Sequence, residues 1–146
     1  MENNLYYYFH HFFNNRYNGK SGYLEENCPQ LAIAYDIGRC QIMRHEFDEE
    51  PVLLNITMTI VSVKWSCKGD VLAIAGSQKT ASQDRDVNIV QFYNPFGQHL
   101  RTLKVPGKEV KAVSWEGSSL RISLAVDSFI YFANIRPDYK VLFVDC

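Results

Sequence analysis

Short apolar runs separated by polar turns follow one another along the chain and predict β-strands. The clearest runs are LAIA at residues 31–34, LAIA at 72–75 and ISLA at 122–125. Each has the length and the apolar composition expected of a strand that is buried on both faces. The only candidate for a helix is the N-terminal tract, so the chain is predicted to be all-β.

The three runs are copies of one repeat. In the first and third copies an Asp follows two residues after the last Ala, at Asp36 and Asp127. In the middle copy the equivalent residue is Asp86, which is reached through a nine-residue insertion at 77–85. The insertion explains the spacing, because the first two copies lie 41 residues apart and the last two lie 50 apart.

Two tryptophans test this alignment. Trp65 and Trp115 each close a predicted strand, and each follows the preceding turn Asp by 29 residues. A bare repeat of 41 residues matches the four-stranded blade of a β-propeller, whose repeats run to about 40–45 residues. A sandwich or barrel of about eight to ten strands also has short, regularly spaced strands, but it has no reason to reproduce both offsets.

The remaining segments of each repeat also have the composition of strands. Between two of them, NPFG at 94–97 fits a type I turn. We predict strands at 31–35, 39–44 and 51–55, then at 59–65, 70–76, 86–93 and 99–105, and finally at 109–115, 120–126 and 129–134. The predicted fold is a partial β-propeller of about three four-stranded, antiparallel, WD-repeat-like blades, at residues 17–55, 56–105 and 106–140.

Three blades form an incomplete ring, because propellers close with about four blades or more. The opening strand of the first blade, expected near Leu24, is predicted to be degraded or missing, since Gly19 and Gly22 weaken a strand there. The end blades would then leave apolar faces open to water. We expect the isolated chain to be marginally stable or to aggregate, unless it completes its core by pairing with another propeller fragment.

Composition and charge narrow the class of function. The 146 residues are 47% hydrophobic and 21% charged, and 15 Lys and Arg against 16 Asp and Glu give a net charge of −1. Such a globular chain lacks the basic surface that nucleic acids and anionic lipids need. No run approaches the roughly 18 apolar residues of a membrane span, and no signal pattern opens the chain. These features predict a cytoplasmic protein with no nucleic-acid partner and no integral membrane span.

The cysteines and histidines are not spaced as metal ligands. The cysteines are irregularly spaced and are predicted to be reduced thiols: Cys28, Cys40, Cys67 and Cys146. The histidines comprise one adjacent pair and two isolated residues: His10, His11, His45 and His99. Zinc sites usually use close pairs of ligands, such as C-x₂-C, and the cysteines form none. We expect no metal and no cofactor.

No catalytic constellation stands out. The chain has no G-x-S-x-G elbow, no phosphate-binding loop and no H-E-x-x-H. His45-Glu46 and the acidic residues 48–50 are interpreted as a solvated hairpin tip rather than an acid/base pair. VPGKE at 105–109 is interpreted as a connecting loop, and residues 84–86 as a charged loop that could contact a partner. We therefore name no catalytic, cofactor-binding or metal-binding residue, and the protein-interaction residues are unknown.

The aromatic tract at residues 1–16, with YYYF and HHFF, does not fit the repeat. We interpret it chiefly as an unstructured leader. One alternative is a membrane-interface anchor, because aromatic rings favour the headgroup zone, although YYYFHHFF lacks the Lys and Arg of such anchors. The other is a strand that fills the open first blade.

Several runs resemble one family of propeller proteins. They are VNIVQFY at 87–93, LKVPGKE at 103–109, SWEG at 114–117 and LAVDSFIYFANIRPDYK at 124–140. Residues 17–140 are similar to the N-terminal propeller of WD-repeat subunits of intraflagellar transport complex A. The Trp-Asp dipeptide is absent, and the corresponding strand ends are Phe92-Tyr93 and Phe132-Ala133. Residues 1–16 and 141–146 lie outside the resemblance.

The resemblance implies a scaffold for protein–protein interaction and not an enzyme. It implies a role in retrograde ciliary transport, cilium assembly and the delivery of membrane proteins to the cilium. The implied partners are other complex A subunits and ciliary membrane-protein cargo, and the implied locations are the cytoplasm, the cilium and the ciliary basal body. The alternatives are a propeller-type hydrolase or lyase, which would need three or more polar side chains converging on one rim or channel, and a nonfunctional truncated isoform.

Overall fold

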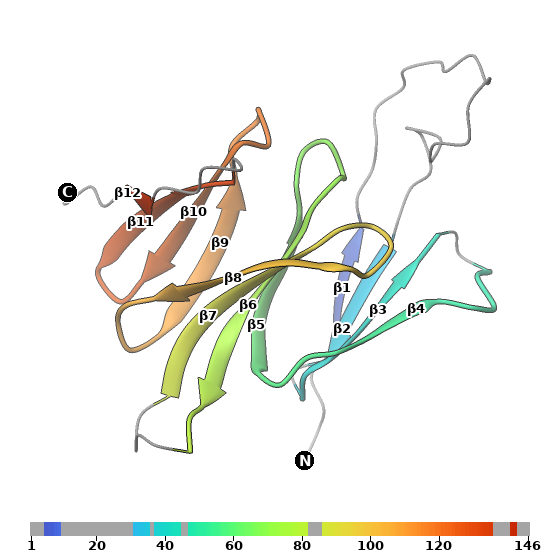
Figure 1. Ribbon diagram of the computed structural model, residues 1–146, viewed down its shortest axis with the longest axis horizontal. Coiled ribbons are helices and arrows are strands. Elements are labelled where there is room, and N and C mark those ends of the chain that lie inside the picture. The colour runs from blue at the N-terminus through green and yellow to red at the C-terminus, as the bar shows by residue number, and fades with distance from the viewer. Residues whose placement is uncertain are drawn as a thin grey trace.

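The computed structural model describes residues 5–9, 31–35, 37–44, 47–81, 86–135 and 141–142. Within these ranges the chain forms strands and no helix, and the strands build three sheets (Figure 1). The first sheet contains β1 (Leu5–Phe9), β2 (Leu31–Tyr35), β3 (Arg39–Met43) and β4 (Val52–Asn55). The second contains β5 (Thr59–Trp65), β6 (Leu72–Lys79), β7 (Asp86–Tyr93) and β8 (His99–Val105). The third contains β9 (Val110–Trp115), β10 (Arg121–Val126), β11 (Phe129–Asn134) and β12 (Val141–Leu142).

Each sheet is an antiparallel meander in which every strand pairs with the next strand along the chain. The first strands of the sheets lie next to one another, since β5 contacts both β1 and β9. This arrangement is that of neighbouring propeller blades, so the predicted partial β-propeller is confirmed. The predicted strands agree with the observed ones within two residues at each end, except in the hairpin of β6 and β7.

Two apolar cores lie between the three sheets, one on each side of the second sheet. The core between the first and second sheets includes Ala32 and Ala34 of β2, and Leu72 and Ile74 of β6. The core between the second and third sheets includes the other two residues of the middle LAIA run, Ala73 and Ala75, and three residues of β10: Ile122, Leu124 and Val126. Because side chains alternate along a strand, β6 presents one face to each neighbouring sheet. The prediction that an LAIA run is buried on both faces is therefore correct for β6.

The hairpin between β6 and β7 differs from the predicted nine-residue loop. Residues 77–79 continue β6, and Lys79 pairs with Asp86, the first residue of β7. The expected turn Asp of the middle repeat therefore lies in a strand, because β6 extends into the insertion as far as Lys79 and pairs there with Asp86. Asp127 does occupy a turn, with a φ of 52°. Asp36 lies outside the described residues.

Both end segments of the chain contribute a strand. Leu5–Phe9 pairs with β2 in the place of the first strand of a blade, which corresponds to the interpretation of the aromatic tract as a strand that fills the first blade. Val141–Leu142 pairs with β11. The opening strand expected near Leu24 falls outside the described residues.

Candidate interaction surface

The outer face of the first sheet is the face turned away from the second sheet. Alternation along the strands places the following side chains on it: Leu31, Ile33, Tyr35, Gln41, Met43 and Leu53. None of them belongs to the buried core, and Leu53 is 71% exposed. The sequence pattern therefore supplies an apolar face that no described sheet covers.

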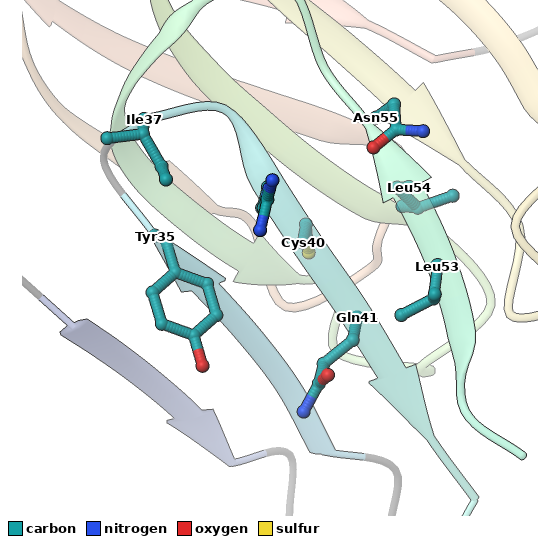
Figure 2. A pocket seen from close by; sticks show the side chains of 8 residues that line it. Tyr35, Ile37, Cys40, Gln41, Leu53, Leu54 and Asn55 are labelled. Carbon is teal, nitrogen blue, oxygen red and sulfur yellow. The ribbon is translucent and has the colours of Figure 1, made fainter.

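A hollow of about 470 Å³ lies on this face (Figure 2). It is lined by Tyr35, Ile37, Arg39, Cys40, Gln41, Leu53, Leu54 and Asn55. Cys40 and Leu54 are buried and also belong to the core behind the sheet, whereas Ile37 and Leu53 are exposed. The lining thus mixes apolar side chains with polar ones in similar measure, and the polar ones include Arg39, Gln41 and Asn55.

The chemistry of the hollow does not suggest acid/base catalysis. The lining residues that the structure describes include one cation, Arg39, and no carboxylate. Burial raises the pKa of the Cys40 thiol to about 12, so this sulfur stays protonated at neutral pH and is a poor nucleophile. The hollow can bind a side chain or a small apolar group, but the residues that line it offer no general base.

The outer face of the third sheet is the face turned away from the second sheet. Its side chains include Ser123 and Ala125 of β10, and Ile130 and Phe132 of β11. Ile130 is 47% exposed. The two outer faces lie at opposite ends of the stack of sheets, with the second sheet between them (Figure 1).

Backbone contacts fix one rim of the stack. The turns that follow β5 and β9 repeat the same hydrogen bonds, since Gly69 N donates to Ser66 O at 2.9 Å and Ser119 N donates to Glu116 O at 2.9 Å. Lys68 N donates to Ser119 Oγ at 2.9 Å and so joins the two turns. These loops are therefore held in place relative to each other.

Tryptophan makes a further link between neighbouring sheets. The indole Nε1 of Trp115 donates to the backbone oxygen of Lys64 at 3.0 Å, and this bond connects β9 to β5. Trp65 stands at the equivalent position of β5 and belongs to the core between the first and second sheets. The two tryptophans that defined the repeat therefore lie at equivalent interfaces.

Asp127 holds the connecting loop between the second and third sheets. Its carboxylate accepts hydrogen bonds from Lys108 N at 2.8 Å and Glu109 N at 3.1 Å. The bond from Lys108 is the main reason that the pKa of Asp127 lies below its ordinary value. Asn88, which is buried in β7, donates from Nδ2 to Gly107 O at 2.9 Å. The segment VPGKE is thus a connecting loop that is anchored on both sides.

The acidic cluster of the β3–β4 loop is organised around a buried carboxylate. Asp48 has a side chain only 2% exposed and pairs with Arg44 at 2.7 Å. It also accepts hydrogen bonds from the backbone N–H groups of Arg44 and Glu50. The bond from the Arg44 side chain is the main cause of a pKa of Asp48 well below the usual range. Asp48 therefore orders the turn, while Glu49 and Glu50 face solvent.

The other residues considered in the sequence are spread over the molecule. Cys40 is buried and Cys67 is exposed, and both are free thiols. His99 is exposed, with its Nε2 2.8 Å from Thr102 Oγ1. Within the described ranges, no three His, Cys, Asp or Glu side chains gather as a possible metal site. The absence of a metal and of a cofactor stays a prediction.

Several of these residues cannot be placed. The residues outside the described ranges include Cys28, Cys146, His10, His11, His45, Glu46, Asp84 and Arg85. Asp86, the last member of the charged cluster, is exposed at the start of β7. The structure therefore does not test a partner-binding role for residues 84–86.

No helix in the part of the chain that the structure describes is long and apolar enough to cross a membrane.

Sequence reasoning predicted that the end blades leave apolar faces open, but it identified neither the residues on those faces nor the hollow. The alternation of apolar residues within each repeat contained this information, because the positions that pack inside the stack recur on the outer faces of the first and third sheets. Assigning residues to an outer face required knowing which face of each sheet another sheet covers.

Comparisons with known proteins agree with this architecture. Residues 11–136 match the profile of the WDR35/TULP4 N-terminal β-propeller family. The chain is 65% identical to human WD repeat-containing protein 35 over 124 residues, which are 85% of this chain and 10% of that protein. The identity to the rat protein is also 65%, over 85% of this chain and 11% of that protein. The mouse Tubby-related protein 4 is 25% identical over 121 residues, 77% of this chain and 8% of its own length.

This chain spans about a tenth of the curated relatives that it matches, and none of those relatives is an enzyme by name. Since the profile match covers most of the chain and all three sheets contain matched strands, the chain belongs to the WDR35/TULP4 N-terminal β-propeller family.

Proposed function

We propose that this chain is a protein–protein interaction scaffold and part of a subunit of intraflagellar transport complex A. The observation that carries the proposal is the 65% identity to WD repeat-containing protein 35 over 85% of the chain. The resemblance of residues 17–140 to complex A propellers extends it to retrograde ciliary transport, cilium assembly and delivery of membrane proteins.

The described side chains support a binding role rather than a catalytic one. Among the described residues the lining of the hollow holds no carboxylate, and the carboxylates of Asp48 and Asp127 accept hydrogen bonds that hold turns. A hydrogen bond from Lys68 N to the Ser119 hydroxyl joins the rim turns, which suits a rigid surface on which other proteins dock. No observation favours the alternative of a propeller-type hydrolase or lyase.

The proposed partners are other complex A subunits and ciliary membrane-protein cargo. The proposed locations are the cytoplasm, the cilium and the ciliary basal body. Residues 17–140 are proposed as the propeller region that performs the scaffold function. Residues 1–16 and 141–146 are proposed as flanking segments, which add the strands β1 and β12 to the first and third sheets.

Affinity capture from ciliated cells tests the proposal. The full-length protein that carries this region is tagged and compared with a version that lacks residues 17–140. We expect mass spectrometry to show complex A subunits with the intact protein and a loss of at least one subunit on deletion. Lys79→Ala, at an exposed position of the β6–β7 hairpin, is the control and keeps all partners.

Recovery of no complex A subunit with the intact protein, or of an identical set with and without the region, would contradict the proposal.

A further inference from the structure

The last strand of the second sheet has an edge that no described strand covers. β8 follows β5, β6 and β7 in the order of this sheet, and among the described strands it pairs with β7 alone. Both neighbouring sheets are present and pack on the two faces of the second sheet. What stays open at β8 is therefore the edge of a sheet whose faces are already buried.

The backbone along this edge can accept another strand. The pairing of β8 with β7 is unbroken from Arg101 to Val105, and its one shift, between Phe92 and Tyr93, lies at the end of β8 next to the turn. In an antiparallel sheet, alternate residues direct their N–H and C=O groups away from the paired neighbour. The unbroken run therefore offers donors and acceptors to an extended segment, as in recognition by β-augmentation.

The edge is also basic. β8 carries His99, Arg101 and Lys104, and no Asp or Glu occurs between residues 94 and 108. The residues of β7 that pair with it, 88–93, are uncharged. Two copies of β8 would place these cations against one another, and like charges on paired strands are destabilising. The charge thus opposes pairing between copies of this chain and favours a segment that carries carboxylates.

The two faces of β8 offer different side chains. Leu103 pairs with Val90 and packs against the core between the second and third sheets. Lys104 pairs with Ile89 of the other core, so its exposed side chain lies on the opposite face. A strand added to this edge would place alternate side chains beside Leu103 and beside Lys104. Apolar side chains suit the first position, and acidic ones suit the second.

We propose that the free edge of β8 binds an extended segment of a partner protein in which acidic and apolar residues alternate. The segment extends the four-stranded second sheet through backbone hydrogen bonds, with carboxylates near Lys104 and apolar side chains near Leu103. A phosphate group matches the charge of the edge, but its oxygens act as acceptors and leave the outward C=O groups without a donor. An extended polypeptide supplies both donors and acceptors.

This inference rests on the proposed scaffold function for its class of partner, a protein, but not on complex A. Affinity capture tests the complex, whereas a synthetic peptide tests the edge, so the two can fail separately. Loss of complex A subunits with intact peptide binding would overturn only the ciliary role, and the reverse result would overturn only the role of β8.

Fluorescence anisotropy with a short labelled peptide tests the binding. The peptide alternates Glu and Val, and the binding protein is the full-length protein that carries this region. We expect saturable binding of this peptide and none of the same peptide N-methylated at its central residues, which cannot donate backbone hydrogen bonds. Failure of the first peptide to bind, or equal binding of the two, would overturn the proposal.

Hydrogen exchange followed by mass spectrometry locates the bound peptide. We expect slower exchange of the amides of residues 99–105 in the presence of the Glu–Val peptide, and unchanged exchange in the β5–β6 turn at 66–71. Protection elsewhere in the protein without protection of β8 would contradict the assignment to this edge.

Reversal of one charge tests the side-chain match. Lys104→Glu is expected to weaken binding of the Glu–Val peptide by about threefold to tenfold and to strengthen binding of a peptide that alternates Lys and Val. Lys79→Glu makes the same change at an exposed position of the β6–β7 hairpin and should bind as the wild type does. Equal weakening by the two variants would show attraction to net charge alone and would overturn the proposal.

Two further measurements keep the outcome clear. If Lys104→Glu lowers the melting temperature, Lys104→Gln and the N-methylated peptide still decide, because neither adds a charge to the strand. Vesicles that contain phosphatidylserine are added to the bound Glu–Val peptide, and we expect no displacement. Release of the peptide by the vesicles would assign the edge to a lipid surface instead.

Discussion

At the scale of single residues, one tight constraint is a close approach of two backbones. Gly76 of β6 lies against β5, where the pairing shifts between Ile60 and Ser62. A Cβ atom added to Gly76 would lie 2.1 Å from the backbone oxygen of Thr59. A backbone oxygen in a paired strand cannot swing away as a flexible side chain can, so only glycine fits this position.

Gly76→Ala is therefore expected to destabilise the protein by about 1–3 kcal/mol, as for an overpacked core site. Urea unfolding followed by circular dichroism measures the free energy of unfolding. Gly117→Ala is the matched control, because nothing lies within 4 Å of its added Cβ, and it should change stability by less than about 0.5 kcal/mol. Equal effects at the two positions would refute the steric explanation.

Two aspartates should make stability depend on acid pH. Folding lowers the pKa of both Asp48 and Asp127 through hydrogen bonds to their carboxylates. A lowered pKa in the folded state means that the unfolded state binds protons more readily. The stabilisation is thus complete above the unfolded pKa of about 4 and is lost as the pH falls through the folded values.

The change that checks this is Asp127→Asn, which keeps a residue that tolerates the positive φ of this turn. We expect a lower melting temperature than wild type at pH 7, and a smaller fall in melting temperature between pH 5 and pH 2. The reason is that Asn has one side-chain oxygen in place of two, so it can accept only one of the Lys108 and Glu109 bonds, and it carries no charge and does not titrate. A fall in melting temperature between pH 5 and pH 2 as large as that of wild type would contradict this role of Asp127.

At the scale of elements, the second sheet holds the first and third sheets together because its two faces contribute to the two cores. Phe92 of β7 is 2% exposed and packs edge to face on Trp115 of β9, with ring centroids 6.2 Å apart. The turn that follows β7 also reaches backward, since a Cβ on Gly97 would meet Val52 of β4 at 2.3 Å. One hairpin therefore contacts the sheets on both sides.

Phe92→Ala should destabilise the chain by about 3–5 kcal/mol, because it leaves a cavity in the core between the second and third sheets. Phe96→Ala removes the same side chain from a site that is 61% exposed and should cost less than about 0.5 kcal/mol. Urea unfolding of both variants at one protein concentration makes the comparison. Similar losses for the two would show that the core between these sheets is not formed as described.

At the scale of the whole molecule, stability depends on how many sheet faces are buried. Both faces of the second sheet pack in a core, whereas no described sheet covers the outer faces of the first and third sheets. The expectation from the sequence that the isolated chain is marginally stable or aggregates follows from these two faces.

We accordingly predict that the purified 146-residue chain either melts at a low temperature or aggregates, because these faces stay in contact with water. Differential scanning fluorimetry and light scattering measure the melting temperature and the size of the species. A sharp two-state melt of a monodisperse monomer would contradict the prediction.

The repeat and most of the strands can be predicted from the order of residues alone. LAIA and the tryptophan offsets fix the blade period because each blade must present the same residues to its neighbour, so spacing along the chain records packing between sheets. Where strands are bounded by strong turn signals, as in Asp86–Tyr93 and His99–Val105, the predicted ends match the structure. The family is indicated by runs of sequence that packing between the sheets does not by itself require.

Which faces of these strands are buried depends on how the sheets pack in the folded molecule. Ile33 and Ile74 occupy equivalent places in identical LAIA runs, yet Ile74 is fully buried and Ile33 lies on an outer face. Burial depends on whether another sheet is present, and that is a property of the assembly rather than of the local pattern. The same holds for Asp127, whose partners Lys108 and Glu109 lie nearly twenty residues away along the chain and meet it only when the third sheet folds against the loop.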